Sequence, residues 1–246
     1  MFDNKFRKSL RFLILASLML VAEFSFSQNI PRTYVAHYTS ESISIDGKAE
    51  ELAWEKAPWS DSYIDIEGKK TPTYDTEMKM LWNDEYLFIH AKLEEPHVWG
   101  TLKQRDTIIF YNNDFEIFID PDGDTHNYYE FEMNVLNTVW DLFLSKPYRN
   151  HGAILGDWDF KGLKSAVSVQ GTLNNASDTD EGWQLEVVIP WSFTAHPGEK
   201  TKVPKNEFWR MNFSRVNWNF DLENGKYQRA KDKESGKYLP EYNWVW

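Results

Sequence analysis

The chain has 246 residues, no cysteine and a formal net charge of −11. Without cysteine it can form neither a disulfide nor a lipoprotein anchor, so the fold must depend on its own hydrophobic core. An acidic surface of this kind argues against nucleic acid and anionic membranes as partners, because phosphate binding requires clustered Lys and Arg.

The first 27 residues are predicted to be a secretory signal peptide. Basic residues within the first eleven positions precede an apolar run, FLILASLMLVA, and small residues follow it. The apolar run is too short to span a bilayer. We expect cleavage after Ser27, a secreted or periplasmic location, no membrane insertion after cleavage, and a single domain over residues 28–246.

From residue 34 onward, short apolar-polar alternations separated by turn residues predict about ten strands. Asp46 introduces the one short helix, and we expect Leu52, Ala53 and Trp54 to face inward from it. The fold class is therefore all-β, an antiparallel sandwich of the jelly-roll or immunoglobulin-like kind. The predicted strands are 34–38, 42–46, 77–82, 86–93, 114–120, 128–134, 138–145, 163–170, 183–191, 208–217 and the end of the chain from 237.

The stretch DFEIFIDPDGDTHNYYEFEMN, residues 114–134, is predicted to be a hairpin with one carboxylate-rich face. If its strands pair, Glu116 lies close to Glu132, and like charges facing each other across a sheet are destabilising. The late strand offers a counter-charge, because Arg210 and Asn212 alternate with apolar residues in WRMNF. We expect a polar sheet face that carries two carboxylates, an arginine and asparagines.

The turn of this hairpin contains three acidic residues, Asp120, Asp122 and Asp124. It fails the EF-hand pattern, because Thr125 and Phe131 stand where the sixth-position Gly and the twelfth-position Glu are required. Asp, Pro and Gly are ordinary turn residues. The two interpretations that remain are a plain hairpin turn and a calcium ion held by these hard oxygen ligands.

The paired carboxylates also raise the question of catalysis. A glycosidase needs two carboxylates roughly 5 to 9 Å apart that flank a glycosidic bond. Glu116 and Glu132 could meet that spacing, but no pocket-forming loop or second acidic motif accompanies them. The same side chains would serve as a hydrogen-bonding floor for a polyhydroxylated ligand. We therefore expect binding without chemistry.

Twelve Trp residues exceed what a core of this size needs, so we expect some of them to stack on flat ligand surfaces such as sugar rings. Trp82 ends a predicted strand at a turn, and Trp246 alternates with Trp244 on the last one. Phe110 or Tyr111, just before the Glu116 strand, is another stacking candidate.

Six segments, in this order, make the chain resemble the family-9 carbohydrate-binding modules and their DOMON-like relatives. They extend over about residues 41–218 and read ISIDGKAEELAW, MKMLWNDEYLFIHAKLEEP, NDFEIFIDPDGD, YYEFEMNVLNTVWDLFL, WQLEVVIPW and WRMNFSRVNW. The resemblance implies a β-sandwich that holds a sugar between two aromatic rings, with polar residues of the same sheet face bound to its hydroxyls.

By position, the resemblance also implies which residues bind the ligand. Glu132 departs from the family pattern, in which a basic residue stands at this place. The implied ligand-binding residues are Phe110 or Tyr111, Glu116, Glu132, Asn134, Arg210, Asn212 and Ser214. Family members continue past the WVW stretch into a second clamp aromatic and a closing strand. We therefore expect one of two things: a chain truncated at its C-terminus, or a domain that lacks the last strand and so has an unpaired sheet edge.

The function predicted from these features is non-catalytic binding of mono- or oligosaccharides, linked to glycan breakdown or uptake. Glycoside hydrolases of the same pathway are the expected partners. The alternative is a DOMON-like haem-binding electron-transfer domain, which needs axial Met and His ligands. Met133 and Met211 alternate inward, however, and no His pairs with them. A glycoside hydrolase is the third, less favoured interpretation.

Overall fold

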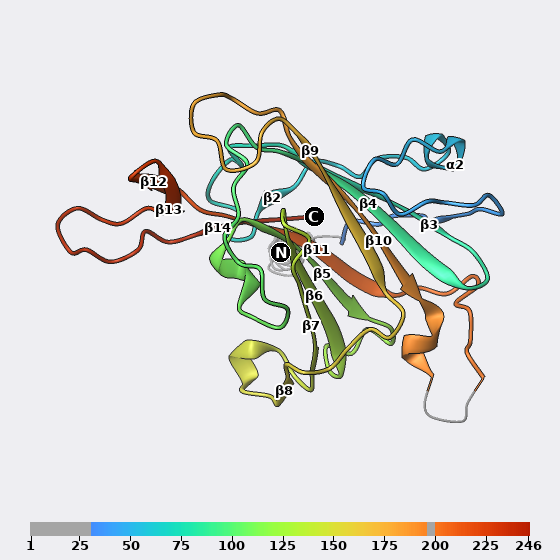
Figure 1. Ribbon diagram of the computed structural model, residues 1–246. Coiled ribbons are helices and arrows are strands. Elements are labelled where there is room, and N and C mark those ends of the chain that lie inside the picture. The colour runs from blue at the N-terminus through green and yellow to red at the C-terminus, as the bar shows by residue number, and fades with distance from the viewer. Residues whose placement is uncertain (1–30, 196–199) are drawn as a thin grey trace, which may run out of the picture. The chain divides into compact units, whose positions relative to one another are not determined.

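The strands form two sheets that pack face to face, because each strand turns one apolar face inward (Figure 1). The computed structural model describes residues 31–195 and 200–246, so the predicted signal peptide lies outside the described residues. Within this part, Phe115, Ile117 and Ile119 of one sheet pack in the same core as Ile89 and Leu185 of the other, all fully buried. The predicted all-β sandwich is confirmed.

One sheet has five strands in the order β1-β3-β4-β10-β9, and the other has seven in the order β2-β14-β11-β5-β6-β7-β8. A separate hairpin, β12-β13, completes the set. The strands are β1 His37–Tyr38, β2 Ile64–Asp65, β3 Thr76–Trp82, β4 Tyr86–Glu94, β5 Asp114–Asp120, β6 Tyr128–Asn134, β7 Val139–Leu144, β8 Ile154–Leu155, β9 Lys164–Gln170, β10 Gly182–Pro190, β11 Arg210–Asn217, β12 Phe220–Glu223, β13 Lys226–Arg229 and β14 Tyr242–Val245. The short helices are α2 Leu52–Glu55, η1 Ile109–Tyr111, η2 Tyr148–Asn150 and η3 Trp191–Thr194.

Two local predictions near the N-terminus are wrong. Residues 42–46 form no strand, and Leu52 of α2 is 66% exposed, whereas Ala53 and Trp54 are buried. Successive helical residues point about 100° apart, so a single turn cannot bury three in a row. The indole Nε1 of Trp54 donates a hydrogen bond of 3.0 Å to Glu186, which holds α2 against the five-stranded sheet.

Residues Tyr34–Trp246 form one compact unit. In the seven-stranded sheet, β14 pairs with β11 on one side and with β2 on the other. β11 is therefore an interior strand of this sheet, between β14 and β5. Among the described residues, no helix is long and apolar enough to cross a membrane.

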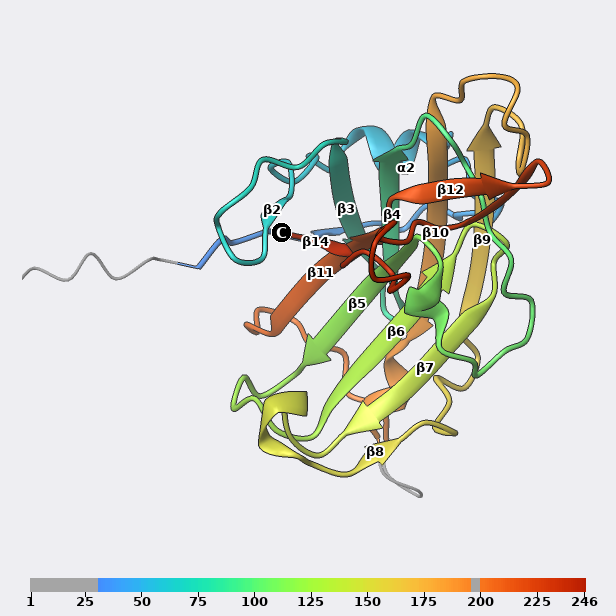
Figure 2. The same ribbon diagram turned by 90° about the vertical axis from the view of Figure 1, so that its left-hand side faces the viewer.

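The register of the seven-stranded sheet decides where the polar face lies. Glu116 pairs directly with Glu132 across β5 and β6, as predicted, and with Ser214 across β5 and β11. Their side chains alternate with the core residues and so point away from the five-stranded sheet. Figure 2 shows β14, β11, β5, β6 and β7 side by side on this outer face.

Candidate functional site: a carboxyl-floored cleft on the seven-stranded sheet

A cleft of about 520 Å³ crosses the outer face of the seven-stranded sheet. Its floor consists of Glu116 from β5, Glu130 and Glu132 from β6, and Asn212 and Ser214 from β11. Aromatic residues surround this floor and give the cleft apolar walls. They are Phe110 of η1, Phe118 of β5, Trp140 of β7 and Tyr148 of η2.

The floor carboxyls hold the two short helices in place beside the sheet. Glu132 Oε2 accepts a hydrogen bond of 3.2 Å from the backbone N–H of Phe110, at the centre of η1. Glu130 Oε2 accepts one of 2.7 Å from the hydroxyl of Tyr148, at the start of η2. The acidic residues of β6 thus position two of the four aromatic walls.

Burial and crowding keep these carboxyls from ionising at their usual pH. Glu116 is only 8% exposed, and burial raises its pKa to about 7. Burial, reinforced by the charge of Glu116, raises the pKa of Glu130 to about 8 and that of Glu132 well above its usual range. Near neutral pH the floor therefore retains protons, and it can both donate and accept hydrogen bonds.

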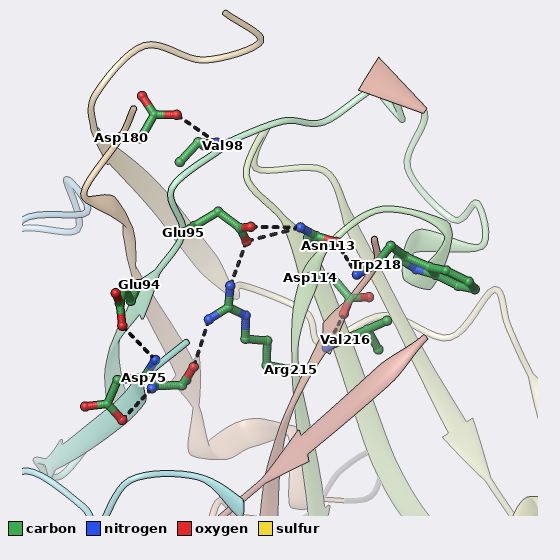
Figure 3. Close-up of polar contacts among 11 residues, drawn as sticks. Asp75, Glu94, Glu95, Val98, Asn113, Asp114, Asp180, Arg215, Val216 and Trp218 are labelled. Atoms are coloured by element: carbon green, nitrogen blue, oxygen red, sulfur yellow. Dashed lines mark hydrogen bonds and ion pairs between the residues drawn. The ribbon is translucent and has the colours of Figure 1, made fainter. Parts of the chain in front are cut away.

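Asp114, the first residue of β5, belongs to the same acidic group. Carboxylate oxygens of Asp114, Glu116 and Glu132 all lie within 4.8 Å of one another. Asp114 is fully buried, and its Oδ1 accepts a hydrogen bond of 3.3 Å from the backbone N–H of Val216 (Figure 3). Its Oδ2 has no hydrogen-bond partner among the described residues. Burial and the neighbouring glutamates raise its pKa strongly.

The predicted counter-charge is absent from this floor. Arg210 is exposed at the far end of β11, and among the described residues it enters no ion pair. The arginine that β11 buries is Arg215, whose Nη2 lies 2.7 Å from Glu95 Oε2 between the two sheets (Figure 3). The two arginines are five positions apart, an odd number, so the period of two puts them on opposite faces of the strand.

Two further predicted ligand-binding residues, Asn134 and Tyr111, do not line the cleft. Asn134 is fully buried, donates 2.9 Å to the backbone carbonyl of Leu102 and accepts from the N–H of Thr138 at 3.1 Å. It thereby fixes the loop that leads to η1. Tyr111 points elsewhere, with the guanidinium carbon of Arg229 4.2 Å from its ring centre.

The two predicted stacking tryptophans also lie outside the cleft. Trp82 belongs to β3 of the five-stranded sheet, where its Nε1 donates 3.1 Å to the carbonyl of Ala36. Trp246 is half-buried and packs edge-on against Phe213, with ring centres 6.2 Å apart. Of the predicted ligand-binding residues, the structure brings together Phe110, Glu116, Glu132, Asn212 and Ser214.

The DPDGD turn is held by its own backbone. Asp120 accepts hydrogen bonds from the N–H groups of Gly123, at 3.0 Å, and Thr125, at 2.9 Å, and Asp124 accepts one from His126 at 2.7 Å. These bonds stabilise the turn, in which Asp and Gly are ordinary residues. Carboxylate oxygens of Asp120, Asp122 and Asp124 nevertheless come within 4.8 Å of one another.

The sequence-based search missed Glu130, Trp140, Tyr148 and Glu241 of the cleft. Side-chain alternation could have identified Glu130 and Trp140. Glu130 lies on the same strand face as Glu132, and Trp140 is the cross-strand partner of Glu132. Tyr148 comes from a 3-10 helix that no periodicity marks. The haem interpretation is not favoured, since Met133 and Met211 both pack into the hydrophobic core.

The chain resembles known proteins in its sequence pattern and in its fold. The family described as "Carbohydrate family 9 binding domain-like" matches residues 45–229. No curated protein matches the chain. Among solved structures, the chain resembles a family-9 carbohydrate-binding module from Caldicellulosiruptor kristjanssonii in complex with glucose, with a TM-score of 0.54 and 16% identity over 87% of this chain and 85% of that one.

A second structure of a family-9 module from the same organism, in complex with cellotriose, gives a TM-score of 0.52 and 15% identity over 86% of this chain and 83% of that one. With sequence identities of only 15% and 16%, the similarity to these two structures shows that the fold is shared. The family match covers well over half of the chain and includes β5, β6 and β11, which carry the floor of the cleft. The chain therefore belongs to the carbohydrate family 9 binding domain-like family.

Proposed function

We propose that the protein binds a mono- or oligosaccharide, without chemical turnover, in the cleft on the outer face of the seven-stranded sheet. The observation that carries this proposal is the combination of a polar floor with aromatic walls in one cleft. A sugar ring presents hydroxyls at its edge and apolar C–H groups on its faces. Such a ligand suits both surfaces at once.

The protonation of the floor supports this ligand class. Each hydroxyl of a sugar both donates and accepts a hydrogen bond. A fully ionised carboxylate floor could only accept, whereas Glu116, Glu130 and Glu132, with their raised pKa values, offer O–H donors as well. Phe110 and Trp140 then supply ring surface for stacking from the side of the cleft.

The arrangement of the carboxyls favours binding over hydrolysis. Glu116 and Glu132 are direct cross-strand partners and point from the same floor. Glycoside hydrolases place their two carboxyl groups on either side of the scissile bond. Glu116, Glu130 and Glu132 project into the cleft from one sheet face, so these three would contact a ligand from the same side.

The biological setting proposed for this binding activity is extracellular or periplasmic. The basic and apolar segments before Ser27 support export, and glycoside hydrolases that release or consume the same glycan are the proposed partners. N-terminal sequencing of the protein from fractionated cells tests the export proposal. A chain that begins at Gln28 outside the cytoplasm supports it, and an intact N-terminus in the cytoplasm contradicts it.

Calorimetric titration with glucose, cellobiose and cellotriose tests the binding proposal. We expect saturable binding to the unaltered protein and at least about a fivefold loss of affinity in Phe110→Ala, because stacking on a ring contributes about 1 to 3 kcal/mol. The matched control is Phe208→Ala, since Phe208 is 94% exposed and lies outside the cleft. Equal affinities in the two variants, or no binding across a broad glycan panel, would overturn the proposal.

A further inference from the structure

The charges of the cleft are all of one sign. The four ionisable carboxyl residues that line it are Glu116, Glu130, Glu132 and Glu241, and no Lys, Arg or His is among its lining residues. The side chains of Glu130 and Glu132 are almost completely buried, at 3% and 2% exposure. A buried carboxylate normally requires a paired cation or several hydrogen-bond donors.

The donors that the protein supplies to this group are few, and none of them is charged. Glu132 receives one backbone N–H, Glu130 one tyrosine hydroxyl and Glu116 the hydroxyl of Ser214, and Glu130 and Glu132 also hydrogen-bond to each other. Asp114 is fully buried, with a carboxylate oxygen within 4.8 Å of those of Glu116 and Glu132, and in the described part of the chain its Oδ2 has no hydrogen-bond partner. The one buried arginine of β11 is already used, because Arg215 pairs with Glu95 on the other face of the sheet. A positive charge is missing from the floor itself.

We propose that the ligand supplies this missing charge, and that the cleft selects a carbohydrate with a free amino group, such as a glucosamine-type amino sugar or its oligomer. This inference rests on the carbohydrate binding proposed above. An ammonium group has three N–H donors and no acceptor. On the floor it meets Glu116, Glu130 and Glu132, while the sugar ring stacks against the aromatic walls.

The energetics favour this ligand over a neutral sugar. Hydrogen bonds between two charged groups are roughly twice as strong as neutral ones, and a buried site screens them little. A bound ammonium also lets the floor carboxyls release the protons that they retain in the free protein. Binding should therefore be coupled to proton release, with a heat that depends on the buffer.

Three matched disaccharides test the inference by calorimetry at neutral pH, in the presence of EDTA. They are cellobiose, N,N′-diacetylchitobiose and fully deacetylated chitobiose, which differ at the C2 substituents. We expect the deacetylated sugar to bind at least about tenfold more tightly than the other two, from one charge-assisted contact. In Glu132→Gln this preference should fall to within about threefold.

The control variant is Glu223→Gln, which removes the same charge from an exposed position on β12, outside the cleft. It should keep the full preference for the amino sugar. Glu116→Gln provides a second floor variant, in which the preference for the amino sugar should also fall. Its thermal melting curve checks that this loss of preference does not come from unfolding.

The outcomes separate the two proposals. If cellobiose binds as tightly as deacetylated chitobiose, the amino-sugar inference is wrong and the carbohydrate proposal stands. If none of the three sugars nor any other glycan binds, both fail. If binding appears only when EDTA is replaced by calcium, the carboxyls hold a metal ion and the amino-sugar inference is overturned.

Discussion

The acidic floor should make the protein lose stability as the pH rises, and Glu132→Gln should relieve part of that loss. A carboxyl whose pKa is higher in the folded than in the unfolded chain favours folding while it stays protonated. Its contribution is fully present below the unfolded value of about 4.5 and is lost as the pH rises through the folded value. Glu116, Glu130 and Glu132 all shift in this direction.

The size of the effect follows from proton linkage. Between its unfolded and folded pKa values, each such group lowers the unfolding free energy by about 1.4 kcal/mol per pH unit. The amide introduced by Glu132→Gln would retain the shape of a protonated carboxyl, including an N–H donor, but would not titrate. We therefore expect this variant to gain on the order of 3 kcal/mol relative to the unaltered protein between about pH 5 and pH 7.

Urea unfolding followed by tryptophan fluorescence at several pH values measures this difference. His90 has an opposing effect, because burial lowers its pKa to about 3, but it is present in both proteins and cancels from the comparison. Glu223→Gln, altered at an exposed residue, should run parallel to the unaltered protein. If Glu132→Gln also runs parallel, the floor carboxyls do not retain protons in the folded state, and the account of the floor fails.

Three other changes have definite expected outcomes. Arg215→Met should lower the unfolding free energy by about 3 to 5 kcal/mol, because it leaves Glu95 buried without its cation; urea unfolding measures the loss, and Arg215→Met combined with Glu95→Leu should recover most of it. Tyr148→Phe should weaken sugar binding severalfold in calorimetry, while the free energy of unfolding changes by only about 1 kcal/mol, because it removes one neutral hydroxyl donor to Glu130. Asp120→Ala should lower the melting temperature equally with and without calcium, because the hydrogen bonds from the backbone N–H groups of Gly123 and Thr125 to Asp120 are lost in both cases. A larger loss in the presence of calcium would instead show a metal site in the turn.

The alternation of side chains was enough to predict the sandwich and the pairing of Glu116 with Glu132. A strand has a period of two, and a short turn between two strands leaves few choices of register. The same reasoning placed Asn212 on the correct face of β11, and the family resemblance added Ser214. These predictions required only local rules, because the residues concerned lie on adjacent strands.

The position of a residue along its strand, and the loops that cover it, could not be predicted from side-chain alternation. Arg210 shares the face of Glu116 but lies opposite Asp120, two pairs away from the floor, so it cannot serve as a counter-charge. Asn134 was placed on the face of Glu132, but the loop that covers it can be seen only in three dimensions. The position of Tyr148 in the cleft wall depends on its contact with Glu130, and the burial of Arg215 depends on its ion pair with Glu95. No local sequence pattern marks either contact.

The hairpin β12-β13 was missed for a different reason. Its turn contains Asn224 and Gly225, both with positive φ, and Asn-Gly is a strong hairpin signal. Its strands have only four residues each and pair with each other alone, so their alternation is too short to detect.

A crystal structure of the protein grown with an oligosaccharide that binds in calorimetry tests the central claim most directly. The account predicts a sugar ring over Glu116 and Glu132, stacked on Phe110 or Trp140 of the seven-stranded sheet. A sugar bound elsewhere, for example beside Trp82 on the five-stranded sheet, with the cleft left empty, would contradict it.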